Sequence, residues 1–229
     1  MQRLFLTTFL GSAILLAAHD VRAETRTETQ YWTAAFLTAR ITGETSAQPG
    51  LSGWFDVHGR FGDDRTVAIV RPGLGYRFSA LASVWLGYAW VPTWIDDAPA
   101  IQEHRIWNQA IFQGTEGLLR YQIRPRLEQR LRQGQDGVGF RFRLFGRANL
   151  RFVDEVPIDV AVWDELFFGL NETSWGQVGG FDQNRAFLGL SSTFGPARVE
   201  AGYLNVAVHR LDGSWLIQHN PMVSLFVTL

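Results

Sequence analysis

The chain has 229 residues and no cysteine, so neither a disulfide framework nor a metal site built on thiolates is available to it. Its 21 basic residues are all arginine and face 22 acidic residues, which gives a formal net charge of −1. Binding to nucleic acid would call for a clear excess of positive charge, so we expect no nucleic acid partner. Aromatic residues make up 14% of the chain and include nine tryptophans, a content typical of the interfacial girdles of membrane β-barrels.

Residues 1–23 have the features of a secretory signal peptide. Arg3 precedes an apolar run from Leu4 to Ala18, and small residues occupy the first and third positions before an expected cleavage after Ala23. A transmembrane anchor is the alternative, but an anchor needs about 20 apolar residues and this run is shorter. Removal of the signal leaves 229 − 23 = 206 residues, which we assign to one domain at 24–229.

The first half of the mature chain is predicted to form short two-faced strands. They cover residues 31–41, 52–61, 67–78, 84–91 and 103–109. In the second of these strands, Asp56 and His58 alternate with Phe55 and Val57, which places polar and apolar side chains on opposite faces. Residues 42–50 and 93–100 are rich in turn-forming residues and are predicted to be surface loops.

Residues 118–130 give the clearest pattern in the sequence. Arg, Gln and Glu occupy every second position from Arg120 to Arg130, and the other parity carries Leu119, Tyr121, Ile123, Pro125 and Leu127. Leucine and isoleucine also recur here every four residues, as on an amphipathic helix. Pro125 argues against the helix, because proline costs a helix interior about 3 kcal/mol.

The following segment, 140–151, favours period two and therefore a β-hairpin. Phe140, Phe142 and Leu144 alternate with Arg141 and Arg143, and only a strand fits that spacing. Residues 134–137 are predicted to form the turn. Like charges directly opposite each other destabilise a sheet, so the facing Arg rows need carboxylate partners or water. We therefore expect the Arg rows to face a wet or ion-paired interior and the apolar rows to face lipid.

The remaining strands are predicted at residues 158–165, 182–190, 198–203 and 223–229, with long loops at 171–180 and about 209–215. The last strand ends the chain with alternating apolar residues, as in outer-membrane barrels, although Leu229 stands where an aromatic residue is usual. The count is eleven strands, whereas bacterial single-chain barrels normally have an even number. We therefore predict an all-β, antiparallel transmembrane β-barrel of about ten to twelve strands, with twelve preferred, and an Arg/Glu-rich interior.

Several motifs in this order resemble the domain of unknown function 2490 family of Gram-negative outer-membrane barrels. The motifs that carry the resemblance are Arg71-Pro-Gly-Leu-Gly-Tyr76, Gly87-Tyr88, Glu103-His-Arg105, Arg124-Pro-Arg-Leu-Glu-Gln-Arg130, Glu165-Leu-Phe167, Phe181-Asp-Gln-Asn-Arg185 and Gly202-Tyr-Leu204. The resemblance covers nearly all of the mature chain. It implies a β-barrel in the cell outer membrane and no established activity.

The candidate functional residues are the charged side chains that alternate along the strands. We expect an interior charge network of Arg71, Glu103, Arg105, Arg120, Arg124, Arg126, Glu128, Arg130, Arg141, Arg143, Arg147, Glu165, Arg185 and Glu200. One hypothesis is a structural network of ion pairs that closes most of the lumen, since buried arginine is costly unless paired. The other is a narrow anion-preferring channel or a chamber for a small anionic ligand.

Two other classes of protein are weighed against the closed barrel. An outer-membrane hydrolase acting on lipid could use His104, His209 or His219 with Ser192, Ser214 or Ser224, but no nucleophile motif accompanies these residues. A soluble lipocalin-like binder would place its apolar faces inward. It would stay in solution without detergent, whereas a membrane barrel would not. A metal site of His58, His104 and His219 lacks ligand spacing.

We accordingly expect no enzyme activity, no catalytic residue, no metal and no cofactor. The expected partners are outer-membrane lipid and the barrel-assembly machinery.

Overall fold

The computed structural model describes residues 24–43, 45, 48–151 and 157–229, so the predicted signal peptide at 1–23 lies outside the described residues. The described chain is built from β-strands joined by turns and loops. The strands are β1 (Thr25–Thr29), β2 (Tyr31–Arg40), β3 (Gly50–Phe61), β4 (Arg65–Arg77), β5 (Ala82–Ile95), β6 (Ala98–Glu116), β7 (Leu119–Arg132), β8 (Gly139–Arg151), β9 (Ile158–Gly169), β10 (Gly180–Phe194), β11 (Ala197–His209) and β12 (Trp215–Thr228). Within this part of the chain, no helix is long and apolar enough to cross a membrane.

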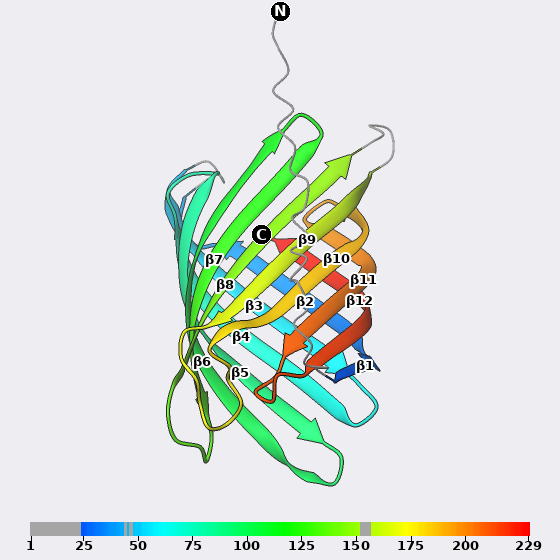
Figure 1. The fold of residues 1–229 in the computed structure, drawn as a ribbon. Helices are drawn as coiled ribbons and strands as arrows, with labels where there is room; N and C mark the ends of the chain where they lie inside the picture. Colours follow the sequence, from blue (N-terminus) through cyan, green and yellow to red (C-terminus); the bar gives the residue numbers. More distant parts are fainter. Residues whose placement is uncertain (1–23, 44, 46–47, 152–156) are drawn as a thin grey trace, which may run out of the picture.

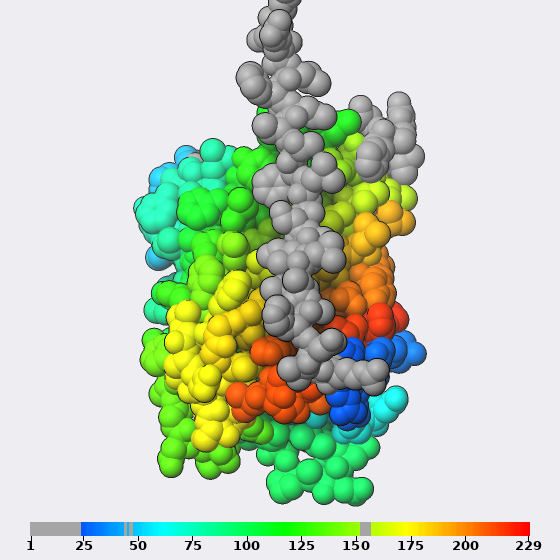
Figure 2. All heavy atoms as spheres, viewed as in Figure 1, coloured from blue at the N-terminus to red at the C-terminus, as the bar shows by residue number. Residues whose placement is uncertain are grey.

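The strands form a closed β-barrel. The sheet of the described residues has twelve strands, and β2 to β12 close into a ring of eleven while β1 precedes β2 along the same edge of β12 (Figure 1). Figure 2 shows the first strands, in blue, lying against the last, in orange and red. The predicted all-β barrel and its count of ten to twelve strands are therefore confirmed.

The closure of the ring is parallel rather than antiparallel. Successive strands of the ring alternate in direction, so the first and the eleventh strand run the same way, and Thr33 on β2 pairs with Val223 on β12 in a parallel register. β1 continues the same direction beside β12, with Thr25 opposite Trp215. An even ring would make every pair antiparallel. The ring has eleven strands, within the predicted range of ten to twelve, and the preference for an even ring of twelve is wrong.

The two faces of the hairpin β7–β8 have opposite character, as its sequence predicts. Arg126 and Glu128 are 1% and 2% exposed, whereas Ile123 and Leu127 on the other parity are 49% and 46% exposed. The register pairs Arg126 with Arg143 across the two strands. The Arg/Glu-rich interior is therefore confirmed, and apolar side chains cover the outside of the barrel.

The predicted loop at 93–100 is wrong. β5 continues to Ile95 and β6 begins at Ala98, so only Asp96 and Asp97 connect them. Asp97 has a φ of 55°, a left-handed conformation that aspartate tolerates better than most residues and that short hairpin turns require. Aspartate and proline in this segment suggested a long loop, but they mark a tight turn between two long strands. The predicted turn at 134–137 and the predicted loop at 171–180 do lie between strands.

Tryptophan lies in the interior of the barrel as well as on its outer surface. Trp32, Trp85, Trp107 and Trp163 are at most 8% exposed and belong to two apolar clusters inside the barrel. The ring of Trp107 lies so close to Gly87 that a Cβ there would come within 2.3 Å of it. Only glycine leaves room for the indole to lie flat against the wall, and the flat rings fill space between the charged residues.

Candidate functional site in the barrel interior

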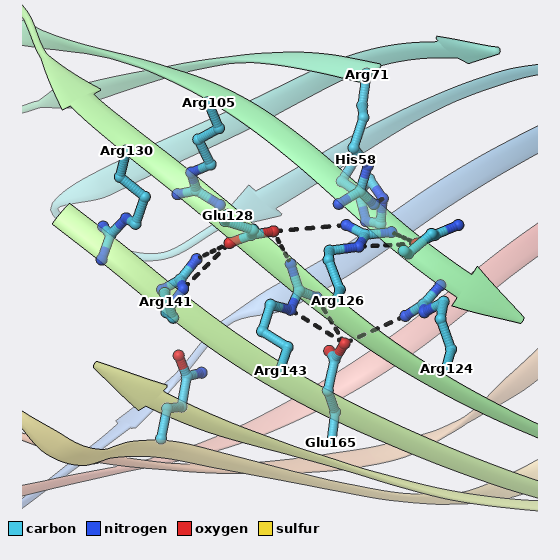
Figure 3. Close-up of polar contacts among 12 residues, drawn as sticks. His58, Arg71, Arg105, Arg124, Arg126, Glu128, Arg130, Arg141, Arg143 and Glu165 are labelled. Atoms are coloured by element: carbon cyan, nitrogen blue, oxygen red, sulfur yellow. Dashed lines mark hydrogen bonds and ion pairs between the residues drawn. The ribbon is translucent and has the colours of Figure 1, made fainter. Parts of the chain in front are cut away.

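Glu128 is the centre of the interior charge network. Its carboxylate is 2% exposed and accepts hydrogen bonds from Arg141, whose Nη2 lies 2.6 Å from Oε2, and from Nη1 of Arg143 (Figure 3). Arg126 lies on the same strand as Glu128, and its Nη1 is 3.5 Å from Oε1. Three guanidinium groups thus share one buried carboxylate. The arrangement relieves the repulsion between the facing Arg rows of β7 and β8.

Glu165 on β9 extends this network to a third strand. Its Oε1 accepts hydrogen bonds from Nη2 of Arg143 at 2.7 Å and from Nη2 of Arg124 at 3.2 Å, and Figure 3 shows both side chains directed at it. Arg185 approaches from β10, with 3.9 Å between its Nη1 and Oε2 of Glu165. Arg143 therefore bridges Glu128 and Glu165, which links β7, β8 and β9 through charge-assisted hydrogen bonds, and Arg185 adds β10 through an ion pair.

Glu103 organises a second group, toward the barrel end that carries the β7–β8 and β9–β10 connections. Its carboxylate accepts from Nε of Arg105 at 2.6 Å and from Arg130, at 2.7 Å to Nε and 2.9 Å to Nη2. Gln177, from the β9–β10 loop, is 1% exposed and accepts a hydrogen bond from Nη1 of Arg130 at 3.3 Å. Arg132 donates to the carbonyl oxygen of Trp175 at 2.7 Å. This loop is consequently held against the charged wall at that end.

Three carboxylates missed by the sequence analysis complete the pairing. Asp56 is fully buried and accepts from Nε of Arg71 at 2.9 and 3.0 Å, and the ring of His58 lies 2.8 Å from it. Asp159 pairs with both Arg120 and Arg151, and Asp182 lies 3.3 Å from Nη1 of Arg141. All three aspartates occupy inward positions of their strands, so the alternation that selected the glutamates could have found them.

An ion pair joins β8 to β11, which lies three strands further along the ring. Nη2 of Arg147 donates to both oxygens of Glu200 on β11, at 2.5 and 2.6 Å, and its guanidinium lies 5.0 Å from the ring centre of Phe226 on β12. Trp163 donates to the same glutamate at 3.2 Å. Sequence proximity did not indicate this pair, because 53 residues separate its members.

Several guanidinium groups lie over the faces of aromatic rings. Phe167, which is completely buried, lies 4.5 Å from Arg143, 4.4 Å from Arg185 and 5.1 Å from Arg141, measured from guanidinium carbon to ring centre. Trp107 lies 4.8 Å from Arg126 in the same way. Cation–π contacts of this kind strengthen when water is excluded. The interior therefore balances positive charge with carboxylates and with the faces of aromatic rings.

Arg60 and Arg198 in the interior have no carboxylate partner among the described residues. Arg60 lies 4.0 Å over Trp32, and Arg198 lies 4.2 Å over Phe226. The Nε atoms of both arginines are buried without a hydrogen-bond acceptor in the described part of the chain. Neither residue belonged to the predicted network.

A cavity of about 810 Å³ occupies the barrel at the end where the C-terminus lies. Its deep part reaches Arg71, Arg124, Arg143 and Glu165 of the charge network. Its outer part is lined by the connections next to the chain end, including the turn Gly195–Pro196. The barrel is thus hollow on the side of the charge network where the C-terminus lies.

The residues considered for hydrolysis or metal binding are placed apart. His104 hydrogen-bonds to Tyr88, and His219 to Tyr203, each between neighbouring strands. His58 is bound within the interior to Asp56. Ser192 donates to the carbonyl of Pro157 and Ser214 to Asp212, Ser224 is buried, and His209 packs against Trp215. In the described residues, no hydrogen bond joins any of these serines to a histidine, and no metal-binding group of His, Cys, Asp or Glu is formed.

Comparison with known proteins identifies relatives without an assigned activity. An uncharacterized protein of Methylorubrum extorquens is 34% identical over 170 residues, which cover 69% of this chain and 71% of that protein. No solved structure matches the chain. The model of the family described as "Protein of unknown function (DUF2490)" matches residues 29–216, and the chain therefore belongs to that family.

Proposed function

We propose that the protein is an outer-membrane β-barrel whose lumen is closed by its own ion-paired side chains. The observation that carries this proposal is the distribution of polarity, with the charged residues buried inside the ring and large apolar residues outside. Leu74, Leu86 and Leu188 are each more than half exposed on the outside, whereas Glu128 and Arg126 inside are nearly inaccessible. A soluble barrel that binds apolar ligands would have the opposite arrangement.

The strands fit a bilayer in length and in satisfaction of their backbone. Strands β3 to β12 have 12 to 19 residues each, more than the roughly 9–11 residues that a tilted transmembrane strand needs. The closed ring leaves no open edge along β2 to β12, and an open edge is what a hydrocarbon environment excludes. The predicted signal peptide at 1–23 would supply the route of export.

The width of the lumen follows from the number of strands in the ring. A ring of about eight strands is just filled by side chains, whereas open porins use about 16–18 strands. A ring of eleven is narrow enough for Arg143, held between Glu128 and Glu165, to obstruct it together with Trp107 and Phe167. We assign the end that bears the C-terminus to the periplasm and the end with the β9–β10 loop to the exterior, as expected for long external loops.

Fractionation of expressing cells tests the proposal. The mature chain should be recovered with the outer membrane, need detergent to stay in solution and migrate differently on gels before and after heating. Recovery in the soluble periplasmic fraction without detergent would refute the membrane placement.

A further inference from the structure

The cavity at the C-terminal end has a composition that the closed lumen does not require. Nine arginines line it, namely Arg40, Arg71, Arg77, Arg120, Arg124, Arg143, Arg147, Arg185 and Arg198. Only two glutamates line it, Glu165 and Glu200. Three more carboxylates, Asp56, Asp159 and Glu128, pair with lining arginines from outside the cavity surface. Nine positive groups therefore meet five side-chain carboxylates and the terminal carboxylate of Leu229, and the cavity keeps an excess of positive charge.

Arg198 contributes to this excess. Arg147 pairs with Glu200, and Arg120 with Asp159, but Arg198 has no carboxylate partner among the described residues. The Nε atoms of Arg198 and Arg147 and the hydroxyl of Thr193 are buried and lack a hydrogen-bond partner there. Buried donors without acceptors destabilise a folded protein. Arg147, Thr193 and Arg198 all line the cavity, and their side chains are suited to an anionic group.

Aromatic rings form the neighbouring wall of the same cavity. Phe36 on β2 and Phe226 on β12 stack with ring centres 4.6 Å apart and planes only 4° from parallel. Trp54 meets Phe36 edge to face at 6.2 Å, and Trp32 also lines the cavity. Arg198 lies directly over Phe226, so the positive group and the apolar wall adjoin. An inorganic anion would contact the positive groups but would make no use of the apolar wall.

We propose that this cavity is a binding site for an amphipathic organic anion. Its acidic group, a carboxylate, sulfonate or phosphate, is bound by Arg198 and Thr193, and its apolar body lies against Phe36 and Phe226. The volume of about 810 Å³ falls within the range of small-molecule sites, about 300–1,000 Å³. The inference rests on the proposed function in one respect, namely that the ligand enters the cavity from the periplasm. The ion-paired layer at Glu128 then forms the floor of the site and prevents passage.

The test is titration calorimetry of the purified, refolded mature chain in uncharged detergent, with empty micelles as blank. The probes are 2-naphthalenesulfonate, the uncharged 2-naphthalenemethanol and inorganic sulfate. We expect saturable 1:1 binding of the sulfonate and at least about tenfold weaker binding of the other two, since each lacks one half of the recognised structure. Equal binding of the uncharged probe, or of sulfate, would overturn the proposal, as would the absence of saturable binding.

Variants locate the site. Arg198→Gln should weaken sulfonate binding about tenfold, whereas Arg65→Gln, an exposed arginine at the opposite barrel end, should leave it unchanged. Thr193→Val and Phe226→Leu provide independent evidence if Arg198→Gln fails to fold, which the heat-dependent gel shift reveals. Equal weakening by Arg65→Gln would mean that net charge alone attracts the probe. A folded, membrane-bound barrel that binds no probe refutes this site only, and a soluble chain that binds it refutes the membrane placement only.

Discussion

Arg126 on β7 and Arg143 on β8 are direct cross-strand partners on the inner face of the barrel, although both are positively charged. Glu128 makes this arrangement stable, because its carboxylate accepts a hydrogen bond from Nη1 of Arg143 and lies 3.5 Å from Nη1 of Arg126. Burial removes water from all three groups, so each depends on the others for compensation. Glu128 thus explains why the β7–β8 hairpin can carry two facing rows of arginine.

Glu128→Gln is therefore expected to lower the free energy of unfolding by about 3–5 kcal/mol, because it leaves Arg141 and Arg143 with less compensation in a buried site. Urea titration of the folded barrel, followed by the heat-dependent gel shift, measures the change. Glu116→Gln is the matched control, since Glu116 is exposed at the end of β6. Equal loss of stability in the two variants would contradict the central role of Glu128.

The outer face gives a second prediction. Ile123→Arg should reduce the yield of folded barrel strongly, because an arginine on a lipid-facing position near the middle of a bilayer costs about 2–4 kcal/mol. Arg120→Gln, three residues away on the inner face, should have a smaller effect, since Asp159 keeps Arg151 as a partner. Heat-dependent gel mobility after refolding into lipid compares the two. Similar yields would show that the outer face does not contact lipid.

Conductance in a planar bilayer tests the closed lumen. The wild-type chain should show no stable porin-sized conductance, because Arg143, Glu128 and Glu165 are held across the interior of a narrow ring. Glu128→Gln should allow a small leak that favours anions, since it removes a negative charge from an interior rich in arginine. A large conductance in the wild type, or a preference for cations in either chain, would contradict the ion-paired closure.

Sequence patterns predicted the faces of the strands more completely than the contacts between them. Period two in 118–130 and 140–151 was enough to place Arg126, Glu128 and Arg143 inside, because side-chain direction along a strand is a local property. The pairing of Arg147 with Glu200 depends on how β8 and β11 face each other across the ring, which no local pattern specifies. The loop expected at 93–100 failed for a related reason, since cross-strand pairing through Ile95 and Ala98 extends both strands.

Strand direction at the closure also leaves no trace in the sequence, because alternation of polar and apolar residues looks the same whichever way a strand runs. The parallel register places Thr33 beside Val223 and Leu37 beside Val227. The chain has no natural cysteine, so pairs of introduced cysteines report on this register without interference. Thr33→Cys with Val223→Cys, and Leu37→Cys with Val227→Cys, should each form a disulfide on mild oxidation of the folded barrel.

The exchanged pairs are the matched controls for this closure. Thr33→Cys with Val227→Cys, and Leu37→Cys with Val223→Cys, separate the cysteines by four positions along neighbouring strands, about 13 Å, which no disulfide spans. An antiparallel closure would reverse the result, since opposite direction brings the exchanged pairs together. Gel mobility before and after reduction therefore decides between the two. Because an odd ring requires one parallel pair, cross-linking of the exchanged pairs alone would also refute the eleven-strand ring.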